Sequence, residues 1–468
     1  MTESLSRPHR REILERGCSD PVWFFREILG AEPWPTQAQV IEAVRDHRHV
    51  AVRSSHSVGK TWLAGRLALW WLYTHLPSIV ITTAPTDRQV KHLLWKEVRT
   101  AHSTASLPLG GSPLLQELKL ADDHFALGFT APERESDRFQ GFHSPSILVI
   151  ADEASGISPE IHDAIDGVLA SGTAHKLEIG NPIDGQSRFA DSFKGGGART
   201  FQIPAFATPN FTTFGIKPQD IASGAWEEMI GNAPLPAPHL VTPEWVSERY
   251  ARWGVDSPMY QSRVLAEFPQ EGTDALIPLA WIEAATRRTL RPAPGDPNEI
   301  GVDVARSGPD ETVIGQRQGP CFTILRTMNG QRTIETTGRV REARGSTGAT
   351  RIKVDVVGVG AGVVDRLQEV GEPVIGVNFG AGANDSERFA NARAEAYWGL
   401  RTRFEEGQID IPEDDLLVEQ LANLKWAPDS AGRVLLAKKQ SPSPDRADCL
   451  AIAFSASGRE PGDLGVTI

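Results

Sequence analysis

The residues with the clearest chemical potential form a short loop near the N-terminus, Ser54-Ser-His-Ser-Val-Gly-Lys-Thr61. An apolar run at 49–53 precedes this loop, and the helical pattern WLAGRLALWWLYTHL follows it. In this context backbone N–H groups bind phosphates, a lysine reaches the β- and γ-phosphates, and a threonine hydroxyl binds Mg²⁺. We therefore predict these roles for Lys60 and Thr61. The full motif begins with glycine where Ser54 stands, so a chance Gly-Lys-Thr at a helix start remains an alternative.

Two adjacent carboxylates strengthen this prediction. Asp152 and Glu153 directly follow the apolar run 147–151. In ATPases with such a loop, a strand-end aspartate binds Mg²⁺, and we expect the glutamate to lie beside the attacking water. Unpaired carboxylates at the end of an apolar strand are otherwise costly. A helix-capping role is the alternative, but Ser155 or Ser158 would cap the next helix better. The loop and the carboxylate pair together predict an ATPase.

An asparagine follows a third strand-like run, Lys176–Ile179, in the sequence Gly180-Asn-Pro182. Next to the phosphate-binding loop, the Asn181 side chain would sense the γ-phosphate. Without the other two motifs, an Asn-Pro turn would be the preferred interpretation.

A second set of carboxylates occurs in the C-terminal part of the chain. Asp303 lies between two valines in the middle of a strand-like run, and Asp355 ends another such run. Asp445 opens a helical run, with Asp448 one turn later on the same face. Aspartates at a strand centre, a strand end and a helix start are the arrangement of an RNase H-like nuclease.

The chemistry of such a nuclease explains the need for these residues. Two Mg²⁺ or Mn²⁺ ions about 4 Å apart hold the attacking and leaving oxygens of a phosphodiester, and both ions prefer hard oxygen ligands. Structural alternatives exist for two of the residues, since Asp445 would also serve as a helix N-cap and Asp310 as a turn residue. Asp303 has no capping role between its two valines.

The charge of the chain is weak evidence about its partners. The formal net charge of −12 argues against a protein coated in nucleic acid. It is compatible with a DNA enzyme that uses small basic patches on an acidic body. One candidate patch is the run Arg433–Lys439, which we interpret as a basic-edged hairpin arm for the DNA backbone. A solvated edge strand protected from aggregation by its lysines is the alternative.

These motifs require an α/β protein of two domains, which is also the natural expectation for 468 residues. Short apolar runs alternating with helical patterns predict a P-loop ATPase core with a parallel-type sheet at 1–203. A Pro-rich lid or linker subdomain is predicted at 204–290, and an interdomain linker at 291–297. A mixed α/β, RNase H-like nuclease domain is predicted at 296–458, followed by a flexible tail at 459–468.

Nothing in the sequence predicts a membrane or extracellular protein. No run of about 18 apolar residues is present, and the start of the chain lacks the apolar core of a signal peptide. The three cysteines are widely spaced and match neither a zinc site nor a disulfide framework. We therefore expect a cytosolic protein with reduced cysteines.

Further motifs resemble those of the large terminase subunits of tailed, double-stranded DNA bacteriophages. Trp34-Pro-Thr-Gln37 is similar to the family's adenine-binding motif, and Arg53 precedes the loop as it does in that family. Ala84-Pro-Thr-Asp-Arg-Gln-Val90 follows the second strand-like run. Tyr260-Gln-Ser-Arg-Val-Leu-Ala-Glu-Phe-Pro269 and Asp274-Ala-Leu-Ile-Pro278 resemble the family's join between motor and nuclease. The resemblance covers nearly the whole chain.

The resemblance implies a set of functional residues. The ATP-binding set is Gln37, Arg53, Ser54, Ser55, His56, Ser57, Val58, Gly59, Lys60, Thr61, Asp152 and Asn181. Thr61 and Asp152 would bind the Mg²⁺ of ATP, and Glu153 would be catalytic. Arg138, or else Arg134, would be an arginine finger that acts on a neighbouring subunit. Asp303, Asp355 and Asp445 form the core of the nuclease site, with Asp448 and Asp310 as lesser metal-ligand candidates.

The resemblance also implies a biological setting. It predicts ATP-driven translocation of double-stranded DNA into a procapsid and endonucleolytic cutting of concatemeric DNA in the cytoplasm of an infected bacterium. The implied partners are DNA, the portal ring of the procapsid and a small terminase subunit, with a pentamer assembled on the portal. The main alternative is a helicase or remodelling ATPase whose C-terminal domain binds DNA without cutting it. A decayed, inactive prophage product is a third hypothesis, which the intact motifs disfavour.

Overall fold

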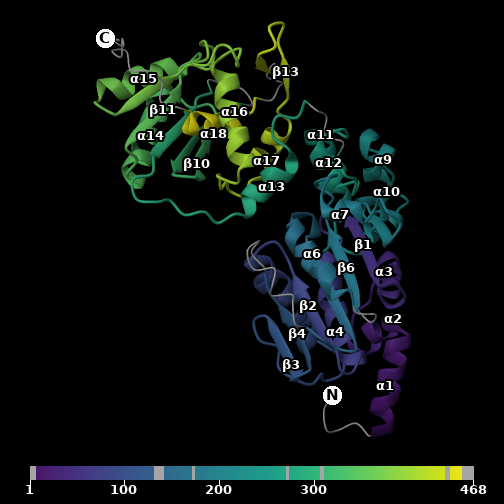
Figure 1. Ribbon diagram of the computed structural model, residues 1–468. Helices are drawn as coiled ribbons and strands as arrows, with labels where there is room; N and C mark the ends of the chain where they lie inside the picture. The colour runs from purple at the N-terminus through teal and green to yellow at the C-terminus, as the bar shows by residue number, and fades with distance from the viewer. Residues whose placement is uncertain are drawn as a thin grey trace. The chain divides into compact units, whose positions relative to one another are not determined.

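The computed structural model describes residues 7–130, 142–170, 174–269, 274–305, 310–437 and 443–455. It separates into two compact units, Met1–Gln270 and Glu271–Ile468, each with its own sheet (Figure 1). Both sheets combine strands with covering helices, so the predicted α/β class is confirmed.

A seven-stranded sheet forms the centre of the first unit, in the order β3-β4-β2-β5-β6-β1-β7. Every neighbouring pair is parallel except the β3–β4 hairpin. The four strands expected from apolar runs are present as β1, β2, β5 and β6, whereas β3, β4 and β7 carry weaker apolar patterns. The bounds are β1 (His49–Ser54), β2 (Ile79–Thr83), β3 (Glu117–Ala121), β4 (His124–Gly128), β5 (Ile147–Asp152), β6 (Ala174–Gly180) and β7 (Arg199–Ile203).

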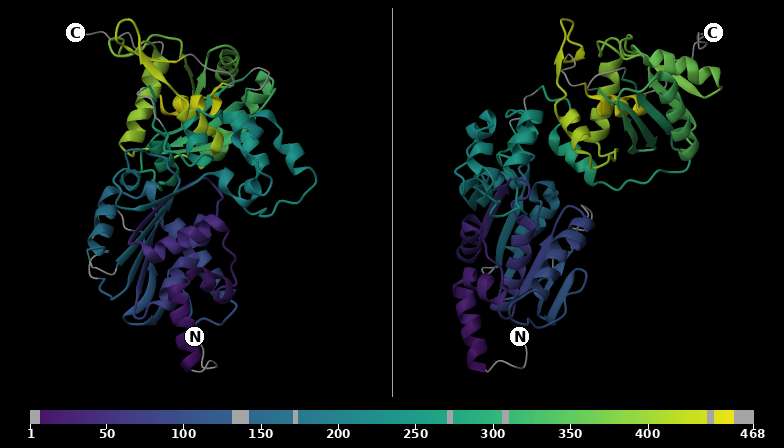
Figure 2. Two further views of the ribbon diagram at one scale, coloured as in Figure 1. Left: turned by 90° about the vertical axis from the view of Figure 1, so that its right-hand side faces the viewer. Right: turned by 180° about the vertical axis from the view of Figure 1, so that it is seen from behind.

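Helices cover both faces of this sheet (Figure 2). On one face α4 (Lys60–Thr74) is buried along most of its length, because α1 (Arg7–Ser19) and α5 (Trp95–Ser103) pack over it. On the other face α6 (Pro159–Val168) joins an apolar cluster with β2 and β5. The remaining helices before residue 204 are α2 (Pro21–Trp23), η1 (Phe24–Ile28), α3 (Pro35–Asp46), η2 (Gln89–Leu94), η4 (Ala154–Gly156) and α7 (Arg188–Asp191).

The Pro-rich segment after β7 consists of short helices and loops, as its composition predicts. Its buried Asn210 side chain donates to the carbonyls of Ala237 at 2.7 Å and Val241 at 3.0 Å, so one amide holds the irregular backbone together. Thr242 caps the next helix by accepting from the Trp245 N–H at 3.2 Å, as predicted. The helices are η5 (Ala205–Ala207), α8 (Pro209–Thr212), α9 (Pro218–Ser223), α10 (Trp226–Ile230), α11 (Pro243–Trp253) and α12 (Pro258–Arg263).

The second unit contains a five-stranded sheet in the order β10-β9-β8-β11-β12. The first three strands along the chain are antiparallel, and β11 and β12 run parallel to β8. This mixed sheet, with helix α18 packed on β8 and β9, is the predicted RNase H-like arrangement. The strands are β8 (Asn298–Asp303), β9 (Thr312–Gln318), β10 (Cys321–Met328), β11 (Arg351–Asp355) and β12 (Val374–Val377), with a separate hairpin of β13 (Trp426–Pro428) and β14 (Val434–Leu436).

The side chains of this sheet alternate between its two faces. Ile300, Val302 and Val354 belong to an apolar cluster with the helices α14 and α15. The residues between them, such as Gly301, face α18 instead. The helices of this unit are α13 (Leu279–Arg287), α14 (Thr333–Thr347), α15 (Gly360–Glu369), α16 (Ala392–Glu405), α17 (Asp415–Ala422) and α18 (Asp445–Phe454).

The unit boundary differs from the predicted one. Helix α13 packs against α16 and α17, so it belongs to the second unit. The Pro-rich run 291–297, expected to link the domains, therefore lies inside that unit, between α13 and β8. Prolines indicate an extended segment there, but they do not show which side of it the apolar face of α13 packs against.

Candidate ATPase and nuclease sites

The predicted phosphate-binding loop connects β1 to α4. Ser57 and Gly59 both have left-handed backbone conformations, with φ of 52° and 82°. A Cβ atom on Gly59 would lie 2.8 Å from the Gln37 amide nitrogen, so this position requires glycine for space as well as for φ. The loop thus turns sharply and presents the N-terminus of α4, where free N–H groups and the helix dipole favour an anion.

A cavity of about 740 Å³ opens beside this loop. It brings together most of the predicted ATP-binding residues and the predicted catalytic glutamate, namely Gln37, His56, Ser57, Val58, Gly59, Lys60, Thr61, Asn181 and Glu153. Ser54 and Ser55 lie beneath the cavity, fully buried. Residues missed from the sequence also line it, namely Leu29, Gly30, Ala31, Glu32, Trp34, Trp62, Arg66, Glu97, Thr104, His239 and Leu240.

Lys60 connects the three motifs. Its ammonium donates to the Asn181 side-chain oxygen at 3.1 Å and to the Ser55 carbonyl at 3.3 Å, and it lies 3.8 Å from the Glu153 carboxylate. The Asn181 amide in turn donates to the Ser54 carbonyl at 2.7 Å. The asparagine is therefore fixed at the base of the loop with its oxygen beside the lysine, where a simple Asn-Pro turn would leave it in solvent.

The strand-end aspartate is positioned to share a metal ion with the loop threonine. The Thr61 hydroxyl donates to Asp152 at 3.3 Å, and Asp152 is 3% exposed. Burial, together with the charge of Glu153, raises the pKa of Asp152 to about 7. A hydroxyl and a buried carboxylate are the oxygen donors that Mg²⁺ uses in ATPases, and a cation there would stabilise the carboxylate, so these residues fit the metal.

The backbone at Glu153 is strained. Its φ is +51°, a left-handed conformation that residues with side chains rarely adopt. Gly180 makes room for this turn, because a Cβ atom there would lie 2.9 Å from the Ala154 N–H nitrogen. The turn aims the glutamate into the cavity beside Lys60.

Gln37 joins the upstream motif to the loop. Its amide nitrogen donates to the Val58 carbonyl at 3.4 Å, and its oxygen accepts from the Trp34 N–H at 3.4 Å. The Pro-rich segment closes over the same loop, since the Val241 N–H donates to the Ser57 carbonyl at 2.9 Å. His239 and Leu240 thereby reach the cavity from about 180 positions further along the chain, which no local pattern could indicate.

The predicted arginines do not lie in this cavity as described. Arg53 donates to the Gln202 side chain at 2.9 Å and lies over the rings of Phe193 and Phe268. It is not among the residues that line the cavity. Arg138 and Arg134 lie outside the described residues.

The nuclease candidates Asp303 and Asp355 are neighbours at the end of the second sheet. β8 and β11 pair in parallel register, Val302 opposite Val354, and each strand ends one residue later at its aspartate. Both side chains are largely buried, and both fall on the face that α18 covers. Asp303 is thus the last residue of its strand and not its centre, because the following loop is held by Thr312, whose hydroxyl accepts from the Ala305 N–H at 3.1 Å.

Asp445 reaches this edge from the first turn of α18. Its carboxylate accepts from the Glu311 N–H at 2.6 Å, and burial raises its pKa, with contributions from the charges of Asp310 and Asp448. It is not the helix cap: the side-chain oxygen of Gln420 accepts from the first N–H groups after it, at 2.9 and 3.0 Å. The aspartate is therefore held for a purpose other than capping.

The two lesser candidates differ in their surroundings. Asp448 is completely buried and accepts from the Tyr397 hydroxyl at 2.6 Å, with Arg393 at 3.5 Å. These contacts give it a structural role at the base of α18. Asp310 is half-buried, and its charge acts on Asp445.

A buried lysine missed from the sequence fixes α18 on the sheet. Lys353 is 1% exposed and donates to Glu299 at 2.7 Å, to the Ser455 carbonyl at 2.7 Å and to the Ala453 carbonyl at 3.3 Å. It therefore binds the C-terminal carbonyls of α18, which favour a cation. Gly301 allows the close approach, since a Cβ atom there would lie 2.7 Å from that of Ala453.

The donor set suits hard divalent cations. Asp303, Asp355 and Asp445 supply carboxylate oxygens from three elements that meet at one sheet edge. Within the described ranges, no group of three or more His, Cys, Asp and Glu side chains is close enough to form a metal site by itself. The predicted hairpin at 433–439 is present through Leu436 as β13–β14, and Arg433 pairs with Asp429 at 2.8 Å.

No family model matches the chain. A probable terminase large subunit of Enterobacteria phage P7 is 25% identical over 322 residues, which cover 66% of this chain and 60% of that protein. The expected resemblance to large terminase subunits is confirmed. The chain spans about three-fifths of the length of this relative.

Solved structures that are similar to this chain include three phage proteins. The nuclease domain of the large terminase subunit gp2 of bacterial virus Sf6 is 20% identical, with 39% of this chain and 100% of that chain covered and a TM-score of 0.35. For the large terminase of a thermophilic bacteriophage the values are 12%, 94%, 98% and 0.38. For the large terminase nuclease of thermophilic phage G20c with bound magnesium they are 17%, 40%, 98% and 0.32. In the part of the chain that the structure describes, no helix is both long and apolar enough to cross a membrane.

Proposed function

We propose that this chain is the large subunit of a phage terminase, which uses ATP hydrolysis to move double-stranded DNA into a procapsid and cuts concatemeric DNA with a metal-dependent nuclease. The observation that carries the proposal is the convergence of Lys60, Asn181 and Glu153 within one cavity. A second carboxylate set on a separate sheet supports the nuclease half. The sequence similarity to the phage P7 protein supports the biological role.

The residues of the first site divide the work of hydrolysis. Lys60 binds the β- and γ-phosphates, Asn181 contacts the γ-phosphate, and Gln37 contacts the adenine. Thr61 and Asp152 hold the Mg²⁺ that neutralises phosphate charge. Glu153 accepts the proton of the attacking water, for which its position beside Lys60 and the cavity is suitable.

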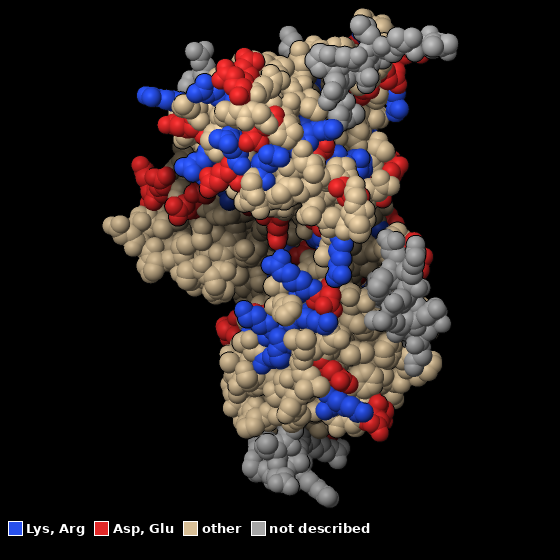
Figure 3. Space-filling model, turned by 90° about the vertical axis from the view of Figure 1, so that its left-hand side faces the viewer, with Lys and Arg blue, Asp and Glu red and all other residues tan. Residues whose placement is uncertain are grey.

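In the second site Asp303, Asp355 and Asp445 hold two Mg²⁺ or Mn²⁺ ions, which would activate the attacking water and stabilise the leaving oxygen. DNA would be held by small basic groups. The face drawn in Figure 3 shows Lys and Arg side chains in small clusters interspersed with Asp and Glu, as the net charge of −12 suggests. Phosphate contacts of this kind bind DNA without reading its sequence.

The proposal includes assembly in the cytoplasm of an infected bacterium. The partners would be the portal ring and a small terminase subunit, with a pentamer of this chain on the portal and Arg138 acting on the neighbouring subunit. An arginine finger in trans is worth roughly 10³-fold or more in rate. Mixing Arg138→Ala with Glu153→Gln protein should therefore restore part of the ATPase activity that each lacks. An assembled mixture that stays inactive would argue against the trans role.

The test uses the purified full-length protein. Lys60→Ala should weaken ATP binding and turnover, whereas Glu153→Gln should bind ATP and turn it over very slowly; the exposed Glu160→Gln is the matched control. Asp303→Ala should abolish nicking of supercoiled plasmid in Mg²⁺ or Mn²⁺ but leave ATPase activity intact, with the exposed Asp365→Ala as control. Wild-type protein that hydrolyses ATP and binds DNA but never nicks it would support the alternative of a helicase or remodelling ATPase.

A further inference from the structure

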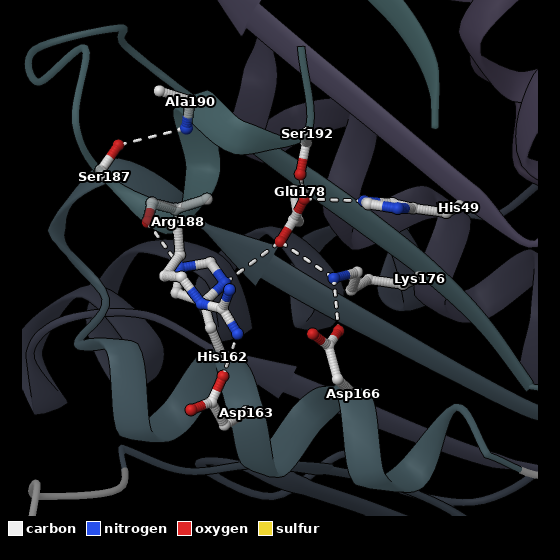
Figure 4. A network of polar contacts seen from close by, with 11 residues as sticks. His49, His162, Asp163, Asp166, Lys176, Glu178, Ser187, Arg188, Ala190 and Ser192 are labelled. Carbon is white, nitrogen blue, oxygen red and sulfur yellow. Dashed lines mark hydrogen bonds and ion pairs between the residues drawn. The ribbon is translucent and has the colours of Figure 1, made fainter. Parts of the chain in front are cut away.

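A buried polar network lies on the α6 face of the first sheet, behind the ATPase cavity (Figure 4). Glu178 of β6 is at its centre and is 1% exposed. One carboxylate oxygen accepts from His162 of α6 at 3.1 Å and lies 3.2 Å from the Lys176 ammonium. The other accepts from His49 at 2.7 Å and from the Ser192 hydroxyl at 2.6 Å. These contacts satisfy the carboxylate from three separate segments of the chain.

The network is connected to the proposed catalytic glutamate through one bond. The second ring nitrogen of His162, Nε2, lies 3.2 Å from the Ala154 carbonyl oxygen. Ala154 directly follows Glu153, whose left-handed φ of +51° must be maintained by its surroundings. His162 is 2% exposed and therefore makes this contact away from solvent.

The hydrogen-bond partners determine the charge of His162. A backbone carbonyl can only accept, and an ionised carboxylate can only accept. Both ring nitrogens of His162 must therefore donate, which requires the imidazolium form. Burial by itself would raise the pKa of Glu178, but hydrogen bonds from His162 and His49 and the charge of Lys176 hold that pKa far below its usual value. The pair is thus a buried imidazolium and carboxylate.

We propose that His162 is a positioning residue for ATP hydrolysis: supported by Glu178, it holds the Ala154 carbonyl and thereby keeps Glu153 in the conformation that reaches the attacking water. This inference rests on the proposed ATPase function. It extends the site to residues on the opposite face of the sheet from α4, none of which lines the ATP cavity. A small displacement of a catalytic group can reduce turnover by about 100-fold.

The first experiment measures kcat and ATP affinity separately for full-length protein. His162→Ala should lower kcat by about 10- to 100-fold and change the dissociation constant for ATP by less than about twofold, because the phosphate loop is untouched. The matched control is His175→Ala. His175 also contacts a backbone carbonyl, that of Val44 at 2.9 Å, but from the other side of β6. The control should keep its kcat.

A conservative variant separates positioning from folding. The Glu178→Gln amide can donate to His162, which then remains neutral and still donates to the Ala154 carbonyl. Lys176 retains Asp166 at 2.8 Å in this variant. Glu178→Gln should therefore keep kcat within about threefold of wild type, whereas Glu178→Ala should behave like His162→Ala.

The pH profile supplies a readout that a purely structural role would not change. In the wild type, kcat should decline at alkaline pH as the imidazolium loses a proton and one of its two hydrogen bonds. In Glu178→Gln this decline should be absent, because the histidine is already neutral. The other charged groups around His162 are Lys176 of β6, His49 of β1 and Asp166 of α6, with Arg188 and Asp191 of α7 lining the same small cavity.

The outcomes are distinguishable. Wild-type protein that does not hydrolyse ATP overturns the proposed function and this inference with it. An active wild type with an equally active His162→Ala variant overturns this inference alone. Equal losses of kcat in His162→Ala and His175→Ala also overturn it, because a general loss of packing would then explain both. Should His162→Ala fail to fold by circular dichroism, the pH profile and kcat of Glu178→Gln decide.

Discussion

Asp152 shows how much stability the ATPase site costs, and a single substitution can measure it. The carboxylate is buried at the end of β5 beside Glu153, and its pKa is raised to about 7. An unfolded chain would have a pKa of about 3.9 at this residue. Between pH 4 and 7 the native protein therefore binds more protons than the unfolded protein. The free energy of unfolding must fall as pH rises through this window, and the full penalty is present above pH 7.

The magnitude follows from the size of the shift. Each pKa unit corresponds to about 1.4 kcal/mol, so a shift of about 3 units corresponds to about 4 kcal/mol at pH 8. Asp152→Asn removes the charge and keeps the local contacts. Its oxygen can accept from the Glu153 N–H, and its amide can donate to the Thr61 hydroxyl. We expect the variant to be more stable than wild type by about 2–4 kcal/mol at pH 8 and by little at pH 4, while it loses ATP turnover.

Hydrogen exchange in β5 during urea titration is the appropriate assay, because it reports the first unit separately from the second. The exposed Asp123→Asn is the matched control and should change stability at neither pH. A variant that is less stable than wild type at pH 8 would refute the reasoning. Equal stabilisation at pH 4 and pH 8 would refute it as well, since the effect would then not come from the charge.

Two further predictions concern the second unit. Gly301→Val should place side-chain atoms against Ala453 of α18, destabilising this unit by about 1–3 kcal/mol and abolishing plasmid nicking while ATPase activity persists; Gly338→Val, with open space around it, is the control, and unchanged nicking would contradict the packing argument. A fragment starting at residue 274 should unfold at a higher urea concentration than one starting at the Pro-rich run, because α13 buries Leu279 and Ile282, each worth roughly 1.5–3 kcal/mol. Equal midpoints would show that α13 contributes nothing to this unit.

The parts of the ATPase site that could be predicted are those encoded in contiguous residues. The loop before Lys60 and the carboxylates after β5 each combine a local apolar run with a local polar motif, so their positions follow from parallel pairing of strands. His162 gave no such signal, because its role depends on Glu178 in a strand that pairs beside β5. The same applies to the cavity residues of the Pro-rich segment, which Asn210 holds in place through contacts that composition does not reveal.

In the second unit the sequence placed three aspartates near one another but could not rank their neighbours. Asp445 and Asp448 share a helix face, and only the tertiary partners of Asp448, Tyr397 and Arg393, indicate its structural role. The prediction that Asp303 lies in mid-strand was wrong because apolar residues continue past the point where the β8 ladder ends. The boundary was misplaced for a related reason, since an amphipathic helix does not encode which sheet it packs against.

The two sites meet the same electrostatic problem in different ways. Each places carboxylates at the carboxyl ends of parallel strands, where burial disfavours charge. At Glu153 the compensating group is the mobile ammonium of Lys60, which is also the group expected to bind phosphate. At Asp355 and Asp445 it is the backbone N–H of Val357 and of Glu311. Backbone donors cannot follow a substrate, whereas a lysine can exchange a carboxylate for a phosphate and so change the surroundings of the catalytic glutamate in each ATP cycle. The first arrangement suits a motor that must respond to its nucleotide, and the second suits a nuclease that must hold its ligands in place.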